Sequence, residues 1–393
     1  MNQNWLKEIQ DRVKKVPVSS GRSNKAGRIS FDDLVFIPAQ LSKTPVDYFK
    51  EEISAKTIIG KNSKKPITLE TPIIIGAMSF GALSKEAKTA LAMASKLAGT
   101  MENTGEGGML SEEREFSEKL IIQYSTGRFG ITEEILQKAD AIEIKIGQGA
   151  KPGQGGLLPA EKVTDEIAQV RKIEKGKDAH SPAYHHDIKK IEDLKERIDW
   201  LREITNGVPI ILKMGAGNIE ADVALAVKAN PDVIAIDGLE GGTGAAPEVM
   251  LNEMGIPTML AAIEARETLD KIGAKQELWI GGGLNKGADF AKVLAMGADA
   301  VFVGSSLLVA MGCLGCRQCY LGKCPKGITT QDQELRKNLD VEMAAQNIAN
   351  FIKNCTEEIK MIAGACGENN VHNLNRSHLR ALDPSKILQR FAN

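Results

Sequence analysis

Eight short apolar runs, separated by stretches with a helical period, constrain the fold of this chain most strongly. The runs are Ile73–Gly76, Gly99–Met101, Leu120–Gln123, Ala141–Ile146, Pro209–Met214, Val233–Ile236, Leu278–Ile280 and Ala300–Val303. The clearest helical pattern covers residues 190–205, where apolar residues recur at steps of three and four. Parallel strands need long crossover connections, so this alternation predicts a parallel sheet. Eight such units favour an α/β fold, a (β/α)8 TIM barrel, over an open doubly wound sheet.

Glycines gather directly after these runs. The chain has 38 of them, in short clusters and at no fixed period. Those that follow the runs are Gly76, Gly147, Gly149, Gly215, Gly217, Gly238, Gly241, Gly242, Gly281, Gly282, Gly283 and Gly304. Barrel enzymes place their chemistry in the loops at the carboxyl ends of the strands. The glycines therefore support the barrel and indicate backbone packed close to a ligand at that face.

The remaining segments lack the strand and helix alternation. Residues 1–70 are polar with weak periodicity, and we predict an N-terminal extension that wraps a barrel of residues 71–312. A cysteine-rich loop follows at 313–331. Residues 332–393 are predicted to form a C-terminal helical tail, helical from Asp340 to Ile362 and polar beyond it.

Composition and charge exclude several classes of protein. Lys and Arg number 50 and Asp and Glu 51, so no net field favours nucleic acid or an acidic membrane surface. No apolar run reaches the ~18 residues of a membrane span. The N-terminus has neither the basic region nor the apolar core of a secretory signal. We therefore expect a cytoplasmic protein that binds neither nucleic acid nor membrane.

Four of the six cysteines lie close together, at Cys313, Cys316, Cys319 and Cys324. Thiols crowded in a cytoplasmic chain favour metal or cluster ligation over disulfides. The compact spacing, closed by a Cys-Pro pair, is typical of an iron–sulfur cluster, with structural zinc as the alternative. The other two, Cys355 and Cys366, are predicted to be buried free thiols.

Loops after the last two runs carry a phosphate signal. Gly281, Gly282 and Gly283 precede one helical stretch, and Gly304 and Ser305 precede another. Glycines let backbone N–H groups approach an anion, and the helix dipole favours negative charge there. The alternative is that these glycines only make tight turns.

Charged residues in the other loops suggest a site for a dicarboxylate. The segment 145–156 places lysines and glutamines among glycines, and the similar segment 103–108 supplies a carboxylate, although either could be a mobile surface loop. Lys213 ends an apolar strand and needs a partner. It could stabilise the negative edge of a reduced flavin, or simply pair with a neighbouring carboxylate. Arg128 could clamp a substrate carboxylate bidentately, or be structural.

The pair His185 and His186 could indicate a metal site. Adjacent histidines point in different directions, so a hydrogen-bonded loop is the better interpretation. A nicotinamide fingerprint, Gly-x-Gly-x-x-Gly after a strand, does not occur in the sequence.

Several of these loops, taken together, resemble the FMN-binding synthase domain of the glutamate synthases. The matching stretches occur in the family's order between about residues 70 and 331. They are Gly76–Ser84, Thr104–Gly108, Ser125–Gly130, Gln148–Gly153, His185–Ile188, Gly241–Ala245 and Cys319–Gly327. The resemblance implies a barrel that binds FMN and converts 2-oxoglutarate and ammonia to 2-iminoglutarate. Hydride from flavin N5 then yields L-glutamate, with electrons supplied through a three-iron cluster.

The resemblance also implies roles for individual residues. It assigns flavin contacts to Ala77, Met78, Ser79, Asn103, Lys213, Gly241, Gly242, Gly282, Gly283, Gly304 and Ser305. Among these, residues 77–79 would lie against the ring, Lys213 near its pyrimidine edge, and the last four around the phosphate. Lys145, Gln148 and Lys151 would hold the oxoacid, with Glu106 beside the reacting centre, and Arg128 is a further candidate substrate contact.

Three cysteines, Cys313, Cys319 and Cys324, match the family's cluster ligands. Cys316 is a fourth thiol within that spacing, so the cluster expected is 3Fe-4S, or 4Fe-4S if Cys316 also ligates. The chain starts without the family's glutamine amidotransferase domain and ends without its β-helix domain. Ammonia is therefore expected from solution or from a separate glutaminase subunit. Electrons are expected from ferredoxin or from an NAD(P)H-oxidising flavoprotein subunit.

The function that this reading predicts is the catalytic core of a glutamate synthase, an oxidoreductase acting on CH-NH2 donors. One alternative is a subunit of the N-methylglutamate synthase type, which uses methylamine. Another is a flavin and iron–sulfur electron-relay subunit. The loop 145–156 argues against a relay, because a relay needs no dicarboxylate site.

Overall fold

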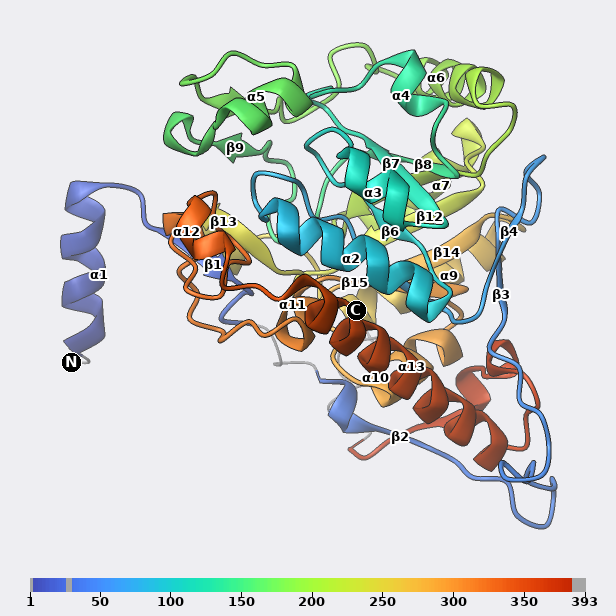
Figure 1. The fold of residues 1–393 in the computed structure, drawn as a ribbon. Helices are drawn as coiled ribbons and strands as arrows, with labels where there is room; N and C mark the ends of the chain where they lie inside the picture. Colours follow the sequence, from blue (N-terminus) through green and yellow to red (C-terminus); the bar gives the residue numbers. More distant parts are fainter. Residues whose placement is uncertain (1–2, 26–29, 384–393) are drawn as a thin grey trace.

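A closed parallel barrel forms the centre of the molecule. The structure, a computed structural model, describes residues 3–25 and 30–383 (Figure 1). Its main sheet has the strand order β5-β15-β14-β12-β11-β8-β7-β6. These strands are β5 (Ile73–Ile75), β6 (Glu102–Asn103), β7 (Leu120–Tyr124), β8 (Ala141–Lys145), β11 (Ile210–Gly215), β12 (Val233–Asp237), β14 (Glu277–Gly281) and β15 (Ala300–Val303). The Ile75 amide donates to the Met101 carbonyl at 3.0 Å, which closes the sheet between β5 and β6. The predicted TIM barrel is confirmed.

One strand differs in position from its predicted run. The run Gly99–Met101 was expected to be the second strand, whereas β6 covers Glu102–Asn103. Gly99 adopts a left-handed conformation with φ of 65° and caps the C-terminus of helix α2 (Lys85–Ala98). The chain can extend only after that cap, so the strand begins later. The other seven runs overlap observed strands.

Helices surround the barrel. They are α3 (Ser111–Phe116), α4 (Glu133–Leu136), α5 (Asp165–Arg171), α6 (Ile191–Ile204), α7 (Ile219–Ala229), α8 (Glu248–Glu253), α9 (Thr258–Lys271), α10 (Gly287–Ala295), α11 (Ser305–Ala310), α12 (Gln333–Arg336) and α13 (Val341–Ala365). Helix α6 confirms the helix predicted from the periodicity of residues 190–205. The Asp340 side chain accepts from the Met343 amide and starts α13. Helix α13 packs along α2 and α10 (Figure 1).

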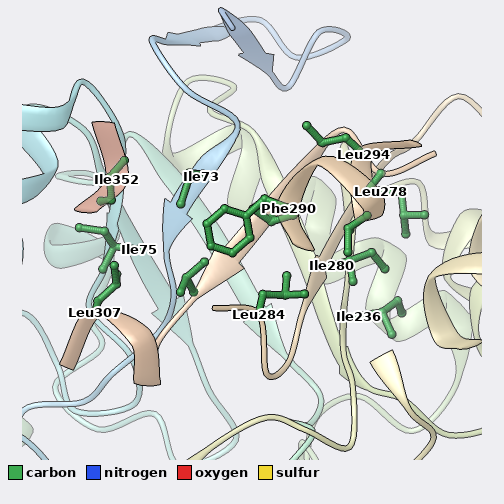
Figure 2. Close-up of a cluster of buried hydrophobic side chains, with 14 of the residues drawn as sticks. Ile73, Ile75, Ile236, Leu278, Ile280, Leu284, Phe290, Leu294, Leu307 and Ile352 are labelled. Carbon is green, nitrogen blue, oxygen red and sulfur yellow. The ribbon is translucent and has the colours of Figure 1, made fainter. Parts of the chain in front are cut away.

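Strand residues alternate between two cores. Ile74 and Trp279 point into the barrel, whereas Ile73, Ile75 and Ile280 face the helices. Figure 2 shows the outer core, in which these isoleucines meet side chains of α10, α11 and α13. Both faces of each strand are therefore covered, which explains why the sequence shows continuous apolar runs and not an alternating pattern.

Short strand pairs attach the N-terminal segment to the barrel. Strand β1 (Val18–Gly21) pairs with β13 (Thr243–Pro247), and β2 (Leu34–Phe36) pairs with β16 (Leu379–Ala381). The hairpin of β3 (Thr57–Ile59) and β4 (Ile67–Leu69) packs Ile59 and Leu69 against the inner core. Helix α1 (Gln3–Lys14) stands apart from the barrel (Figure 1).

The remaining elements are short. Strand β9 (Leu157–Leu158) pairs with β10 (Ala179–His180). Single 3-10 turns are η1 (Phe31–Asp33), η2 (Ala160–Lys162), η3 (Cys319–Leu321), η4 (Val371–Asn373) and η5 (Arg376–His378). Cys355 and Cys366 are free and buried, as expected. Within the described residues, no helix has both the length and the apolar character that crossing a membrane requires.

Candidate active site at the carboxyl ends of the strands

The loops that leave the strands meet one another backbone to backbone. Gly105, with φ of 66°, lies against residues 78–79, where an added Cβ would come within 2.7 Å of the Met78 carbonyl carbon. Across the mouth, a Cβ on Gly149 would lie 2.0 Å from the Gly238 carbonyl oxygen. Only glycine allows such approaches. The contacts bring the predicted ring-binding segment 77–79 beside the segment that carries Glu106.

An ion pair joins two of the predicted catalytic residues. Lys145 ends β8, Glu106 follows β6, and Lys145 Nζ lies 3.0 Å from Glu106 Oε2. Burial is the largest influence and opposes ionisation of this carboxyl, but the charge of Lys145 together with hydrogen bonds from Ser181, Lys145 and Ser125 outweighs it and lowers the pKa of Glu106. The other oxygen, Oε1, is buried and has no hydrogen-bond partner among the described residues. It can accept a hydrogen bond from a ligand.

A second lysine lies close to this pair without a counter-ion. Lys151 Nζ has only a neutral acceptor, the Ala245 carbonyl, at 3.4 Å. No carboxylate among the described residues is within ion-pair distance of it. Burial and the charge of Lys145 lower the pKa of Lys151 to about 8. Gln148 belongs to the same loop, and its backbone packs against Gly215 at the end of β11. The arrangement favours an anionic ligand between these side chains.

Arg128 is engaged by neighbouring side chains. Its NH2 group donates to both carboxylate oxygens of Asp187, at 2.8 and 3.1 Å. Its guanidinium stacks on the Tyr124 ring, 3.6 Å from the centroid, and it also donates to the Ser125 carbonyl. This geometry favours the structural alternative for Arg128, and direct contact with substrate stays a prediction.

His185 connects Arg128 to the backbone at Lys145. Burial and the nearby Arg128 charge lower the pKa of His185 to about 4, so the ring is neutral at pH 7. Nδ1 then accepts from Arg128 at 2.6 Å, and Nε2 donates to the Lys145 carbonyl at 2.8 Å. The pair His185 and His186 thus forms the hydrogen-bonded loop expected, with His185 buried and His186 exposed.

Lys213 lies inside the barrel mouth. The strand register places it beside Lys145 on β8 and Ala235 on β12. Its Nζ is 3.7 Å from Asp237 Oδ2 and 4.7 Å from the centre of the Phe302 ring. The carboxylate partner considered for Lys213 is therefore present. Contact between Lys213 and a flavin stays a prediction.

The glycine loops after β14 and β15 form a cradle at the strand ends, with the side chains of Thr258 and Glu240 packed against Gly282 and Gly283. Gly282 and Gly283 have φ of 118° and 72°. A Cβ on Gly304 would enter open space, with Met78 Sδ at 3.9 Å as its nearest neighbour. Gly242 packs on Ser305, whose Oγ would lie 2.2 Å from an added Cβ. The residues predicted to bind the phosphate are thus adjacent to the predicted ring segment, and this arrangement fits a flavin mononucleotide.

The four clustered thiols line one small cavity of about 30 Å³, together with Leu308 and Ile328. Burial raises the pKa of Cys324, but backbone N–H groups of residues 326, 328 and 329 outweigh it and lower that pKa overall. Such N–H groups suit a thiolate ligand. Among the described residues, however, no three His, Cys, Asp or Glu side chains are close enough together to hold a metal ion. The iron–sulfur cluster stays a prediction.

Sequence reasoning missed two residues of the site. Asp237, at the end of β12, is the partner of Lys213. Arg171 of α5 is buried and donates from NH2 to the Phe80 carbonyl at 2.6 Å, and burial lowers its pKa to about 10. An added Cβ on Gly107 would lie 3.3 Å from the same nitrogen, so Arg171 braces both adjoining loops. No local pattern marks either residue, because their partners are distant in sequence.

A larger cavity, of about 690 Å³, lies at the opposite end of the barrel. Its lining includes Lys64, Arg202, Asn230 and Gln276, from segments that precede or flank the amino ends of the strands. None of the predicted site residues lines it. Barrel enzymes use the carboxyl face for chemistry, so this cavity is set apart from the candidate site.

Comparison with solved structures defines the class of fold. A mandelate oxidase variant carrying an FMN adduct superposes with a TM-score of 0.57 at 15% identity, covering 95% of each chain. A flavocytochrome b2 variant gives a TM-score of 0.59 at 17% identity, over 95% of this chain and 83% of the other. The chain therefore has the TIM-barrel fold that these oxidoreductases share.

The family follows from sequence comparison. A family model described as the conserved region in glutamate synthase matches residues 2–369, and the chain belongs to this family. A glutamate synthase large subunit-like protein of Rhizobium meliloti is 43% identical, over 90% of this chain and 84% of its own length. The archaeal glutamate synthase [NADPH] of Archaeoglobus fulgidus is 40% identical, over 97% and 81%. The large chain of Bacillus subtilis glutamate synthase [NADPH] is 39% identical over 74% of this chain but only 20% of its own length.

Proposed function

We propose that this chain is the catalytic core of a glutamate synthase that binds FMN and reductively aminates 2-oxoglutarate to L-glutamate. One observation carries the proposal. Lys151 is an ammonium group without a counter-ion, beside the Lys145–Glu106 pair, at the mouth of a barrel of the glutamate synthase family. A dicarboxylate supplies the negative charge that this arrangement lacks.

The chain's own residues would hold the cofactor in the glycine cradle. Segment 77–79 would lie along the ring, Lys213 at its pyrimidine edge, and Gly283, Gly304 and Ser305 at its phosphate. Asn103, whose Oδ1 accepts from the Gly105 amide, shapes the adjoining loop. Reduced FMN supplies the hydride that converts an imine to an amine.

Substrate chemistry would fall to the charged loop residues. Lys151 and Gln148 would bind the carboxylates of 2-oxoglutarate, with Lys145 directed at the keto group. Lys145 and the hydrogen bonds from Ser181 and Ser125 keep Glu106 ionised, and its Oε1 can take a proton from ammonia as nitrogen adds to the keto carbon and pass that proton to the former keto oxygen. Loss of water then leaves 2-iminoglutarate. Arg128 and His185 would act by fixing the backbone at Lys145.

The cysteine loop would hold an iron–sulfur cluster that passes electrons to the flavin. Cys313, Cys319 and Cys324 would ligate a 3Fe-4S cluster, or a 4Fe-4S cluster with Cys316 included. Partner subunits would supply electrons, from ferredoxin or from NAD(P)H through a flavoprotein, and a glutaminase would supply ammonia.

Replacement of one ligand tests the cluster. We expect Cys319→Ser to abolish visible absorbance that is not due to flavin, and Cys366→Ser, a buried thiol far along the chain, to retain it. Absorbance and iron content unchanged in Cys319→Ser would mean that the loop has another role, such as binding zinc.

An anaerobic half-reaction tests the proposed function. The protein is reduced, 2-oxoglutarate and ammonium are added, and the flavin absorbance is followed while glutamate is measured. Reoxidation with formation of glutamate is expected. Reoxidation by 2-oxoglutarate with methylamine but not with ammonium would indicate the N-methylglutamate type. No reoxidation with either amine, with or without partner subunits, would favour the electron-relay alternative.

A further inference from the structure

The N-terminal strand β1 reaches the glycine cradle from outside the barrel. It pairs with β13, with Gly21 opposite Thr243. The side chain of Ser20 is buried, donates to the Gly244 carbonyl at 2.5 Å and accepts from the Tyr320 amide at 2.9 Å. These contacts fasten β1 between the loop after β12 and the cysteine loop. The next residue after the strand, Arg22, is thereby held at a defined place.

Arg22 lies where the loops after β12, β14 and β15 meet. Its NH1 group donates to the Gly283 carbonyl at 3.3 Å, and NH2 donates to Asn285 Oδ1 at 2.9 Å. The preceding carbonyl, of Gly21, would lie 3.6 Å from a Cβ on Gly242, the glycine that packs on Ser305. The guanidinium therefore borders the residues assigned to the phosphate.

The charge of Arg22 lacks a direct counter-ion in the described part of the chain. Both of its hydrogen bonds go to uncharged oxygens, and no carboxylate among the described residues is within ion-pair distance of it. Glu240 and Asp289 are near enough to influence it. Each has another partner, since Glu240 accepts from Thr258 and Asp289 from the Asn285 amide.

A second arginine lies next to β1. The aliphatic stem of Arg317 packs on Gly21, 3.4 Å from an added Cβ. Burial, and then the charge of Arg317, lower the pKa of Arg22. Glu240 and Asp289 act in the opposite direction, but neither is within ion-pair distance of Arg22, so an anion bound in the glycine cradle would find a guanidinium at its edge. A guanidinium has five N–H donors, and the structure uses only two of those of Arg22.

We infer that Arg22 is a phosphate-binding residue of the FMN site, supplied to the barrel by the N-terminal strand. This inference rests on the proposed function, because the anion it assigns is the 5′-phosphate of FMN. It gives the N-terminal segment a part in cofactor selection: Arg22 favours the phosphorylated flavin over riboflavin, while the ring contacts stay the same for both.

Flavin titration tests the assignment without any turnover. Apoprotein is titrated with FMN and with riboflavin, and the quenching of flavin fluorescence gives each dissociation constant. We expect Arg22→Ala to raise the dissociation constant for FMN by about 10- to 100-fold, the range for a lost charge-assisted hydrogen bond. The dissociation constant for riboflavin should not change. Arg22→Lys keeps the positive charge but loses the paired N–H donors of the guanidinium. Its affinity for FMN should therefore lie between those of the wild type and Arg22→Ala.

The control is Lys25→Ala, which removes a positive charge three residues away that pairs with Glu253. It should bind both flavins as the wild type does. Equal weakening of FMN and riboflavin by Arg22→Ala, or no change in either, would overturn the assignment of Arg22 while wild-type FMN binding still supports the proposed function. Wild-type protein that binds neither flavin would overturn both.

Discussion

At the scale of single residues, the lysines of the site differ in how their charges are compensated. Lys145 has Glu106 at 3.0 Å, and Lys213 has Asp237 at 3.7 Å. Lys151 has only a carbonyl oxygen. An uncompensated ammonium costs free energy in the absence of ligand and attracts an anion. The differences therefore suggest which lysine binds substrate and which ones position charge.

Lys151→Ala should weaken binding of 2-oxoglutarate by about tenfold or more, as expected for loss of a charge-assisted contact. FMN binding should not change, because Lys151 lies away from the glycine cradle. The flavin spectrum of the purified protein reports whether FMN is bound, and its change on titration with 2-oxoglutarate gives the affinity for that ligand. Lys177→Ala, an exposed lysine paired with Glu174, is the matched control. Loss of flavin from Lys151→Ala would show that the loop serves the cofactor.

The affinity for 2-oxoglutarate should depend on pH through the same residue. The pKa of Lys151 is lowered to about 8, so the amine is charged at pH 7 and largely neutral at pH 9. Because the charged form binds a dicarboxylate, affinity should fall as pH rises through about 8. Dissociation constants between pH 6.5 and 9.5 measure this. If the affinity of Lys151→Ala for 2-oxoglutarate falls over the same pH range, the titrating group is not Lys151.

At the scale of elements, a buried ion triad joins α2, β6 and α3. Lys88 Nζ lies 2.9 Å from Glu102 and 2.8 Å from Glu113, and none of the three side chains is exposed. Lys88 also donates to the Asn103 carbonyl at 3.0 Å. The triad therefore sets the backbone at the start of the loop that carries Glu106.

Lys88→Met leaves two buried carboxyl groups without the cation that they share. Breaking a buried ion pair in this way should reduce the free energy of unfolding by about 3–5 kcal/mol. Burial already raises the pKa of Glu102 to about 8 in the presence of Lys88, so loss of that lysine should raise it further. Urea unfolding provides the measurement. Lys96→Met, on the exposed side of α2, should have a midpoint near that of the wild type, and equal midpoints for both variants would contradict the prediction.

At the scale of the whole molecule, segments from both ends of the chain complete the barrel. Helix α13 covers α2 and α10, and β16 pairs with β2 from the N-terminal segment. Strand β1 joins the cysteine loop to the mouth through Ser20. The barrel and its extensions thus share one set of contacts, and we expect them to unfold together.

Ile352→Ala tests whether α13 belongs to the cooperative core. Its side chain is fully buried in the outer core shown in Figure 2. The cavity should reduce the free energy of unfolding by about 2–5 kcal/mol while a single transition is retained. Met361→Ala, on the exposed face of the same helix, should cost much less. A separate early transition for α13 would mean that the helix folds as an independent appendage.

Local sequence patterns were enough to predict most of the barrel strands and two of the helices. Burial on both faces makes barrel strands apolar throughout, so seven of the eight runs coincide with strands, and 3.6-residue periodicity located α6 and α13. The exception is β6, where a glycine in the left-handed conformation at the end of α2 delays the strand. The approach of glycine-rich loops to a common face also followed from the sequence, because parallel strands end at one edge.

Which charged groups meet was decided only by the tertiary structure. Glu106 and Lys145 come from different strands, and Arg128 reaches Asp187 across a long insertion. Arg171 comes from α5, in the long segment between β8 and β11, and Arg22 comes from the N-terminal segment. Periodicity reports how a segment is buried, which is a local property. The partner of a charge depends on where the chain returns, and hydrogen bonds and ion pairs between distant segments leave no local pattern.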